Sequence, residues 1–316
     1  MATTGSHTSS TTVVYAALAG NLAIAATKFV AFALTGSSAM LTEAIHSSVD
    51  TGNQGLLLLG LARAKKPPSD THPFGYGMEV YFWAFVVALL IFALGGAFSI
   101  YEGVLKIRQP EPIARAWINF LVIGLAALFE GASFLVAWRQ FKVVRKDTPF
   151  LRAIRRSKDP SIFAVLLEDG AALAGLAIAA LGVAGSAVFG VAWADGAASV
   201  AIGVLLIAVA IFLASETRSL LTGESASPAI VEAVREMLAA DARIDTVAEV
   251  LSMHLGPQEI LLGVTLDFHD DLTASDIEDA ADDFAVRIRE IDARITRVFV
   301  RSGRARAAYA RPLEAQ

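Results

Sequence analysis

Three ionisable residues interrupt an apolar stretch near the start of the chain: Glu43, His46 and Asp50. His46 and Asp50 are four residues apart, so on a helix they lie about 40° apart and one turn along the axis, and both can face one point. An imidazole nitrogen and a carboxylate oxygen are good ligands for zinc. Glu43 lies on the same broad face and is a secondary candidate. The spacing predicts a metal-ligand pair, with a structural hydrogen-bonded pair as the alternative.

Further carboxylates occur in two later apolar stretches, as Glu130 in one and as Glu168 and Asp169 in the other. Ionisable residues inside a membrane are costly, so each is a candidate for function. Adjacent helical residues point about 100° apart, so Glu168 and Asp169 both reach one ion only if it lies between them. We expect Asp169 to be a ligand. Glu168 is a ligand, a proton relay or a cap for a neighbouring polar group, and Glu130 is a secondary candidate.

The composition excludes several classes of protein. Hydrophobic residues make up 55% of the chain and charged residues 18%, whereas a soluble domain is nearer a quarter charged. The absence of cysteine excludes disulfides, thiolate metal sites and cysteine nucleophiles. The net charge of −5 gives no indication of nucleic-acid binding. No nucleophile and base are spaced for catalysis, so we do not expect an enzyme.

Apolar runs of about 20 residues recur along residues 12–221, and each is long enough to cross roughly 30 Å of hydrocarbon. In lipid these runs must be helices, because their backbone groups have no other partners. We predict an α-helical membrane protein with six transmembrane helices at 12–34, 38–62, 80–101, 117–139, 161–184 and 192–214. Residues 1–11 are polar and expected to be disordered. They lack the basic segment of a signal peptide, so the first span is expected to be retained.

Lysine and arginine are unevenly divided among the links between these spans. They are frequent in 63–66 and 142–158, whereas 185–191 has none. The link after the third span, with Lys106, Arg108 and Arg115, runs against the trend but is outnumbered. The bias predicts that both termini are cytoplasmic. The expected location is the bacterial inner (cytoplasmic) membrane, as a multi-pass protein.

The remainder of the chain has the pattern of a small α+β domain at residues 224–302. Helical patterns at 228–240 and 275–291 alternate with strand patterns at 246–254, 259–268 and 295–300, in the order αββαβ. Ser275 and Glu278 have the spacing of a capping box at the start of the second helix. Residues 303–316 are expected to be a disordered tail.

Several segments together resemble the cation diffusion facilitator family. The run from Gly36 to Asp50 is similar to that family's second-span motif. His72-Pro-Phe-Gly-Tyr-Gly77 and Pro110-Glu-Pro112 are similar to segments beside its third span. The resemblance covers roughly residues 12–302. Leu167 to Ala172 and the Phe129-Glu130-Gly131 segment are most similar to the branch that contains the animal mitochondrial zinc transporters.

The resemblance implies two ligands from the second span and two from the fifth, around one tetrahedral site. His46, Asp50 and Asp169 match that pattern, but Val165 occupies the position of the usual histidine. Either Glu168 supplies the missing ligand, or three residues and water bind the ion. A site with more oxygen ligands accepts manganese or iron(II) more readily than a zinc site with two histidines does. His72 matches one ligand of a second site found in many members.

The function implied is secondary active transport of a divalent cation, with zinc exported from the cytoplasm in exchange for protons. Zinc displaces protons from its ligands, and the imidazole of His46 titrates in the useful range. Manganese, iron(II) or cobalt transport by the same mechanism is the alternative, as is a non-transporting membrane scaffold, which Val165 keeps open. The family also implies a ferredoxin-like fold for the cytoplasmic C-terminal domain, and a homodimer formed through it.

Overall fold

A computed structural model describes residues 5–35, 38–110, 116–145, 153–154 and 158–303. For some helical positions, including 5–12 and 38–46, it describes the backbone alone. The chain divides into two compact units, and the short 68–77 segment belongs with the second. The first unit comprises residues 1–67 and 78–218, and the second comprises 68–77 and 219–316.

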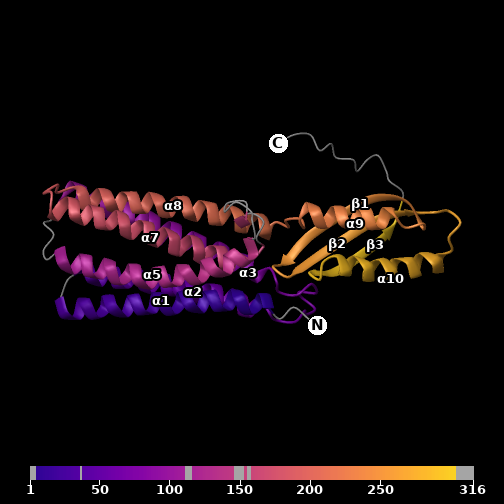
Figure 1. Cartoon of the computed structure of the whole chain (residues 1–316), viewed down its shortest axis with the longest axis horizontal. Helices are drawn as coiled ribbons and strands as arrows, with labels where there is room; N and C mark the ends of the chain where they lie inside the picture. The colour runs from indigo at the N-terminus through magenta and orange to yellow at the C-terminus, as the bar shows by residue number, and fades with distance from the viewer. Residues whose placement is uncertain (1–4, 36–37, 111–115, 146–152, 155–157, 304–316) are drawn as a thin grey trace. The chain divides into compact units, whose positions relative to one another are not determined.

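The first unit is a bundle of long helices that run side by side (Figure 1). Its elements in chain order are α1 (Gly5–Thr35), α2 (Ser38–Ala64), α3 (Glu79–Leu90), η1 (Ile91–Ala97), α4 (Phe98–Arg108), α5 (Ala116–Arg145), α7 (Pro160–Ala187) and α8 (Ala194–Leu221). The segment η1 is a π-helix that joins α3 to α4, so these three elements form one continuous helix. A π-helix of this length was not expected from the sequence, and such insertions often occur at functional sites.

Five stretches of helix within the described residues are long and apolar enough to cross a membrane. They are Val13–Val30, Glu79–Arg108, Ala116–Lys142, Pro160–Ala187 and Ala194–Leu221. These correspond to five of the six predicted spans, and the protein is an integral multi-pass membrane protein. The helix α2 is long enough, at 27 residues, but it is not one of the five. Its polar residues lower its hydropathy, and the sixth span stays a prediction.

The ends of the first helix differ from the prediction. The helix α1 begins at Gly5, so residues 5–11, expected to be disordered, are helical in the structure. The prediction was based on where apolar residues begin, but the hydrogen bonds of a helix can continue through polar residues beyond the hydrocarbon. The predicted disordered tail, apart from Gly303, lies outside the described residues.

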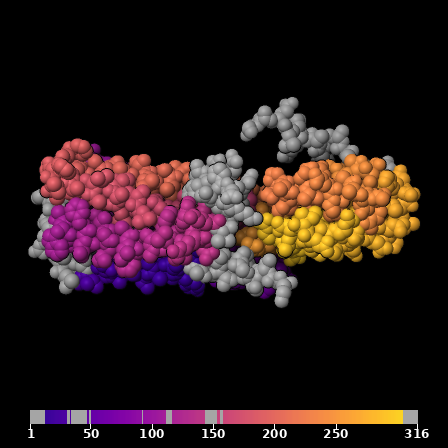
Figure 2. All heavy atoms as spheres, viewed as in Figure 1, coloured from indigo at the N-terminus to yellow at the C-terminus, as the bar shows by residue number. Residues whose placement is uncertain are grey.

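An apolar stripe on α5 faces away from the bundle. Trp117, Leu121, Leu128 and Leu135 are 51–67% exposed and recur at helical spacing. In the view of Figure 2, α5 forms the middle of the surface of this unit, with α7 and α8 on one side and α1 on the other. Such an exposed apolar stripe on a long helix is expected where the helix faces lipid.

The helix α8 approaches η1 and α4 through paired glycines. A Cβ added to Gly103 would lie 2.7 Å from the carbonyl oxygen of Gly196, and one added to Gly203 would lie 2.7 Å from that of Gly96. The backbones are therefore nearly in contact, a packing that small residues permit in membrane helices. Close by, Lys106 Nζ of α4 lies 3.2 Å from Asp195 Oδ2 of α8.

The second unit contains a three-stranded sheet and two helices. Its elements are α9 (Pro228–Ala239), β1 (Ile244–Gly256), β2 (Glu259–Phe268), α10 (Ala274–Ile291) and β3 (Ile295–Ser302), which gives the predicted order of helices and strands. The strand β2 is central, antiparallel to β1 and parallel to β3. One face of β2, with Ile260, Leu262, Val264 and Leu266, is buried in a core that Val234 and Phe284 of the helices complete.

The start of α10 corrects one detail of the prediction. The capping box is formed by Thr273 and Asp276, and not by Ser275 and Glu278. Thr273 Oγ1 accepts a hydrogen bond from the backbone N–H of Asp276 at 3.3 Å, and Asp276 Oδ2 accepts one from the Thr273 N–H at 2.8 Å. Both pairs have the required spacing, but aspartate at the third position serves here as well as glutamate.

Candidate metal site

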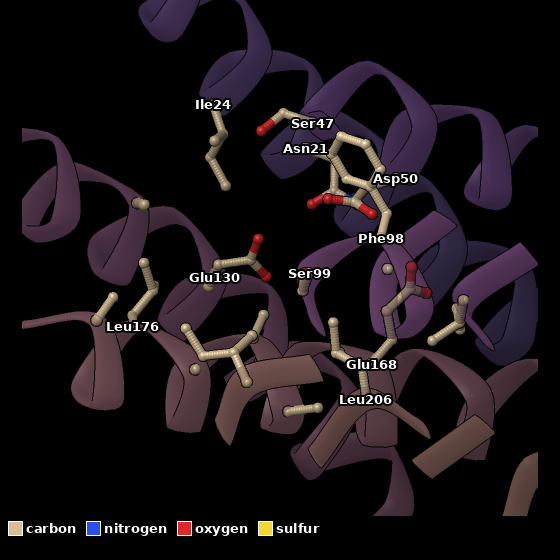
Figure 3. A pocket seen from close by; sticks show the side chains of 18 of the residues that line it. Asn21, Ile24, Ser47, Asp50, Phe98, Ser99, Glu130, Glu168, Leu176 and Leu206 are labelled. Carbon is tan, nitrogen blue, oxygen red and sulfur yellow. The ribbon is translucent and has the colours of Figure 1, made fainter. Parts of the chain in front are cut away.

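A cavity of about 230 Å³ lies inside the helical unit. Side chains from every described helix of this unit contribute to its wall (Figure 3). Its polar lining consists of Asn21, Lys28, Ser47, Asp50, Asn53, Ser99, Glu102, Lys106, Glu130, Glu168, Asp169 and Ser199. A polar cavity of this kind within apolar helices is where a membrane protein places ionisable residues that act on a solute.

Four of the predicted carboxylates meet at this cavity, although they come from three helices. Asp50 lies on α2, Glu130 on α5, and Glu168 and Asp169 on α7. Figure 3 shows Asp50, Glu130 and Glu168 reaching toward the cavity from these helices. Asp50 interacts electrostatically with each of the other three. Carboxylates that line one cavity in a low dielectric repel one another, so a cation in the cavity is favoured.

The carboxylate of Asp169 is almost completely buried, with 1% of the residue exposed. Its Oδ2 accepts a hydrogen bond of 2.6 Å from the hydroxyl of Ser133 on α5. Its Oδ1 has no hydrogen-bond partner among the described residues. A buried carboxylate oxygen without a partner is costly, and a bound cation would remove that cost.

The carboxylate of Glu168 is held by two amide side chains of α2. Asn53 Nδ2 donates to Oε1 at 3.3 Å, and Gln54 Nε2 donates to Oε2 at 2.8 Å. Sequence reasoning missed Gln54 and Ser133. Gln54 follows Asp50 by four residues, so helical spacing alone places it on the face of the predicted ligands. Ser133 follows Glu130 by three residues, which places it on the cavity side of α5.

The position of the usual family histidine is occupied by hydrocarbon in the structure as well as in the sequence. Val165 is fully buried and belongs to the apolar cluster of the helical unit, together with Leu57 and Phe163. Its side chain supplies no ligand, and it is not among the residues that line the cavity as the structure describes it. Any fourth ligand must come from another position, and Glu168 is the neighbouring carboxylate that lines the cavity.

The remaining predicted site residues are not among the described residues that line this cavity. His46 and Glu43 lie within α2, but their side chains are outside the described residues. His72 is exposed in the 68–77 segment, where its ring stacks on Tyr76 with centroids 4.3 Å apart. Among the described side chains, no three histidine, aspartate or glutamate groups lie close enough together to hold one ion.

Apolar membrane-spanning helices around an acidic cavity define a polytopic membrane protein of the kind that handles cations. Within that class the family is clear. The family profile described as the cation efflux transmembrane domain matches residues 14–222. The chain belongs to this family, that of the cation diffusion facilitators, as the motifs around Asp50 and His72 predicted.

Named relatives agree with the predicted branch of the family. The chain is 32% identical over 243 residues to the mouse protein named proton-coupled zinc antiporter SLC30A9, mitochondrial, which covers 76% of this chain and 43% of the relative. The human protein of the same name is 33% identical over 243 residues. Metal tolerance protein C4 of Arabidopsis thaliana is 33% identical over 251 residues, which is 79% of this chain and 55% of the relative. The chain thus spans about half the length of these curated relatives, and the names of the animal relatives are those of transporters, not of enzymes.

Proposed function

We propose that the protein is a secondary active transporter that moves a divalent metal cation, zinc foremost, across the membrane in exchange for protons. The observation that carries this proposal is the convergence of Asp50, Glu130, Glu168 and Asp169 on one cavity inside the membrane helices. The named zinc antiporters among the relatives support the choice of metal and of coupling.

In this proposal the transported ion is bound by His46 and Asp50 of α2 and by Asp169 of α7, and Glu168 is the fourth ligand. His46 precedes Asp50 by one helical turn, and an imidazole adds the nitrogen ligand that zinc favours over an all-oxygen set. Glu130 lines the same cavity and is a secondary candidate. His72 is a secondary candidate for a separate site in the 68–77 segment.

Proton exchange follows from the chemistry of these ligands. Carboxylates and imidazole bind a metal ion only after they lose their protons, so metal and protons compete for one set of groups. Metal that enters from the cytoplasm displaces protons, and protons that enter from the other side displace metal. Alternating exposure of the cavity to the two sides then gives export of the metal in exchange for protons.

The oxygen content of the site supports a second group of substrates. With Val165 in the position of the usual histidine, carboxylates supply most of the ligands, and such sites accept manganese, iron(II) or cobalt more readily than histidine-rich zinc sites do. We therefore propose these ions as further substrates of the same mechanism. A non-transporting scaffold is the function left if no metal moves.

The proposed arrangement has six transmembrane helices within residues 12–221, with α2 as the sixth. Residues 224–302 form a ferredoxin-like domain through which two copies of the chain form a homodimer. We place both termini in the cytoplasm, as the distribution of lysine and arginine in the links indicates, and we propose the bacterial inner membrane as the location.

Proteoliposomes test the proposed function directly. We expect a proton gradient to drive zinc uptake by the wild type, whereas Asp50→Ala and Asp169→Ala abolish uptake without loss of folded protein. Asp271→Ala removes an exposed carboxylate of the second unit and should leave uptake unchanged. Comparing the uptake of zinc with that of manganese, iron(II) and cobalt gives the transporter's order of preference among these metals. Undiminished proton-driven uptake by Asp50→Ala would exclude this site, and no uptake of any metal by the wild type would favour the scaffold.

A further inference from the structure

The two side-chain amides that donate hydrogen bonds to Glu168 are both buried. Asn53 is 1% exposed and Gln54 is not exposed at all. Glu168 and Asn53 line the cavity, whereas Gln54 is not among the described residues that line it. Gln54 donates to Glu168 and does not itself line the cavity as the structure describes it, so it can orient the carboxylate without touching a bound ion.

Each of these side-chain amides has a hydrogen-bond partner at its nitrogen but none, among the described residues, at its oxygen. The nitrogen of each donates to Glu168, but Asn53 Oδ1 and Gln54 Oε1 are buried with no hydrogen-bond partner among the described residues. Burying a polar atom without a partner is costly, and an apolar side chain of similar shape would avoid that cost. An apolar side chain at position 54 would, however, leave Glu168 Oε2 without its donor, so what this glutamine supplies is the hydrogen bond of its N–H group to Glu168.

Two amide hydrogen bonds fix the carboxylate of Glu168 at both oxygens. Each carboxylate oxygen has two lone pairs, so an amide on each side still leaves lone pairs for a metal ion. Hydrogen-bonded partners behind a ligand orient it and tune its affinity for metal, and their loss typically weakens binding 10- to 100-fold. Asp169 has an equivalent partner in Ser133, at 2.6 Å. The two adjacent carboxylates of α7 are thus each oriented from a neighbouring helix.

We propose that Gln54, assisted by Asn53, is the positioning residue that makes Glu168 the fourth protein ligand of the transported cation in place of the histidine that Val165 replaces. This inference rests on the proposed function and deepens it. Gln54 acts only through Glu168. The shorter bond, at 2.8 Å, assigns the larger share of this role to Gln54, and the bond of 3.3 Å assigns a smaller share to Asn53.

The test is zinc binding to the full-length chain in detergent, measured by equilibrium dialysis beside thermal unfolding. Gln54→Met keeps the side-chain length but has no N–H group. We expect it to weaken zinc binding about 10- to 100-fold. The unfolding temperature should fall as well, because Glu168 Oε2 loses its donor, so affinity is compared at a temperature at which both proteins are folded. Ser161→Ala is the matched control. Ser161 is also fully buried on α7 with an unpartnered side-chain oxygen, but it does not contact Glu168 in the structure, and its loss should leave zinc affinity unchanged.

A double-mutant cycle separates positioning from general packing. In a Glu168→Gln background, Gln54→Met should change zinc affinity by less than about twofold, because the group on which it acts is already lost. Equal weakening in both backgrounds, or equal weakening by Ser161→Ala, would overturn the inference. If Gln54→Met proves too unstable to purify, Asn53→Leu takes its place in the same cycle, with a smaller effect expected.

The outcomes also separate this inference from the proposed function. If the wild type binds zinc and Glu168→Gln weakens that binding, but Gln54→Met does not, only the role of Gln54 is wrong. If Glu168→Gln binds zinc as the wild type does, Glu168 is not a ligand, although transport can still stand. If the wild type binds neither zinc nor cobalt(II) nor manganese(II), the proposed function and the inference fail together.

Discussion

The carboxylates in the two units of the molecule receive hydrogen bonds from different kinds of donor. In the second unit, Asp241 accepts hydrogen bonds from Arg243 and Arg287, and both arginines also reach Asp283. In the helical unit, the hydrogen bonds that Glu168 and Asp169 receive come from the neutral side chains of Asn53, Gln54 and Ser133. The carboxylate of Asp241 is thus paired with arginines, whereas those of Glu168 and Asp169 are oriented by neutral donors.

This difference indicates which carboxylates are structural and which are available for binding. The hydrogen bonds from Arg243 and Arg287 hold the pKa of Asp241 well below its usual range, so this group stays ionised and paired near neutral pH. A carboxylate paired in this way has no remaining charge to offer. Amide and hydroxyl donors orient a carboxylate without cancelling its charge, so Glu168 and Asp169 can still attract a cation.

The largest effect is expected where a cavity carboxylate loses its charge. Asp169→Asn should lower proton-driven zinc uptake about 100-fold or more, because loss of a ligand exceeds the 10- to 100-fold cost typical of losing its outer partner. Ser133→Ala, which removes that partner, should cost about 10-fold. Both are measured in proteoliposomes, with thermal unfolding alongside. A large loss of folded protein in Asp169→Asn would place this carboxylate with the structural ones and break the comparison.

An intermediate effect on stability, and none on transport, is expected in the arginine cluster. Arg243→Met should destabilise the second unit by about 1–2 kcal/mol at pH 7, a value reduced for the partial exposure of the pair. Because the pKa of Asp241 is lowered by folding, this stabilisation is complete above the unfolded value of about 3.9 and is lost as the pH falls below it.

Hydrogen exchange of β1 and α10 amides in the full-length chain measures this effect. The difference between Arg243→Met and wild type should shrink as the pH falls below about 4. Zinc uptake at pH 7 should match the wild type. A difference that does not change with pH would mean that the arginine stabilises through its stacking on Phe284, whose ring centroid lies 4.7 Å away.

The smallest effect is expected at the start of α10. Thr273→Ala removes the capping hydroxyl and should cost about 1 kcal/mol in the opening of this helix, seen by hydrogen exchange of its first turn. Ser275→Ala, at the position that the sequence pattern favoured, should cost less. Transport should be unchanged in both variants, and a loss of transport would show that the second unit contributes more than a folded support.

The sequence-based prediction was accurate where an element depends on residues close together in the chain, and it was incomplete where contacts join residues far apart in the chain. The strand predicted at 259–268 and the helix predicted at 228–240 agree with β2 and α9 to within one residue, because their patterns of alternating or periodic apolar residues are local. The five apolar spans were found for the same reason. The lengths of the membrane helices were underestimated, because hydropathy marks where a helix meets lipid and not where its hydrogen bonds end.

The site was predicted only in part. Buried charge was enough to select Asp50, Glu130, Glu168 and Asp169, which the structure brings to one cavity. The partners of these carboxylates were not foreseen. Gln54 and Glu168 are 114 residues apart in the chain, and no local pattern indicates which helices face each other. Amides are also frequent in ordinary contacts between membrane helices, so their presence alone does not mark a site.

The burial of Val165 has a consequence for how this protein can change over evolutionary time. Val165 is fully buried in an apolar cluster, where an imidazole is both larger and more polar than the valine, and overpacking costs about 1–3 kcal/mol before any unsatisfied nitrogen is counted. A single substitution therefore does not convert this site into one with a histidine on α7. The apolar side chains around position 165 must repack as well, so a change from one kind of site to the other passes through less stable intermediates.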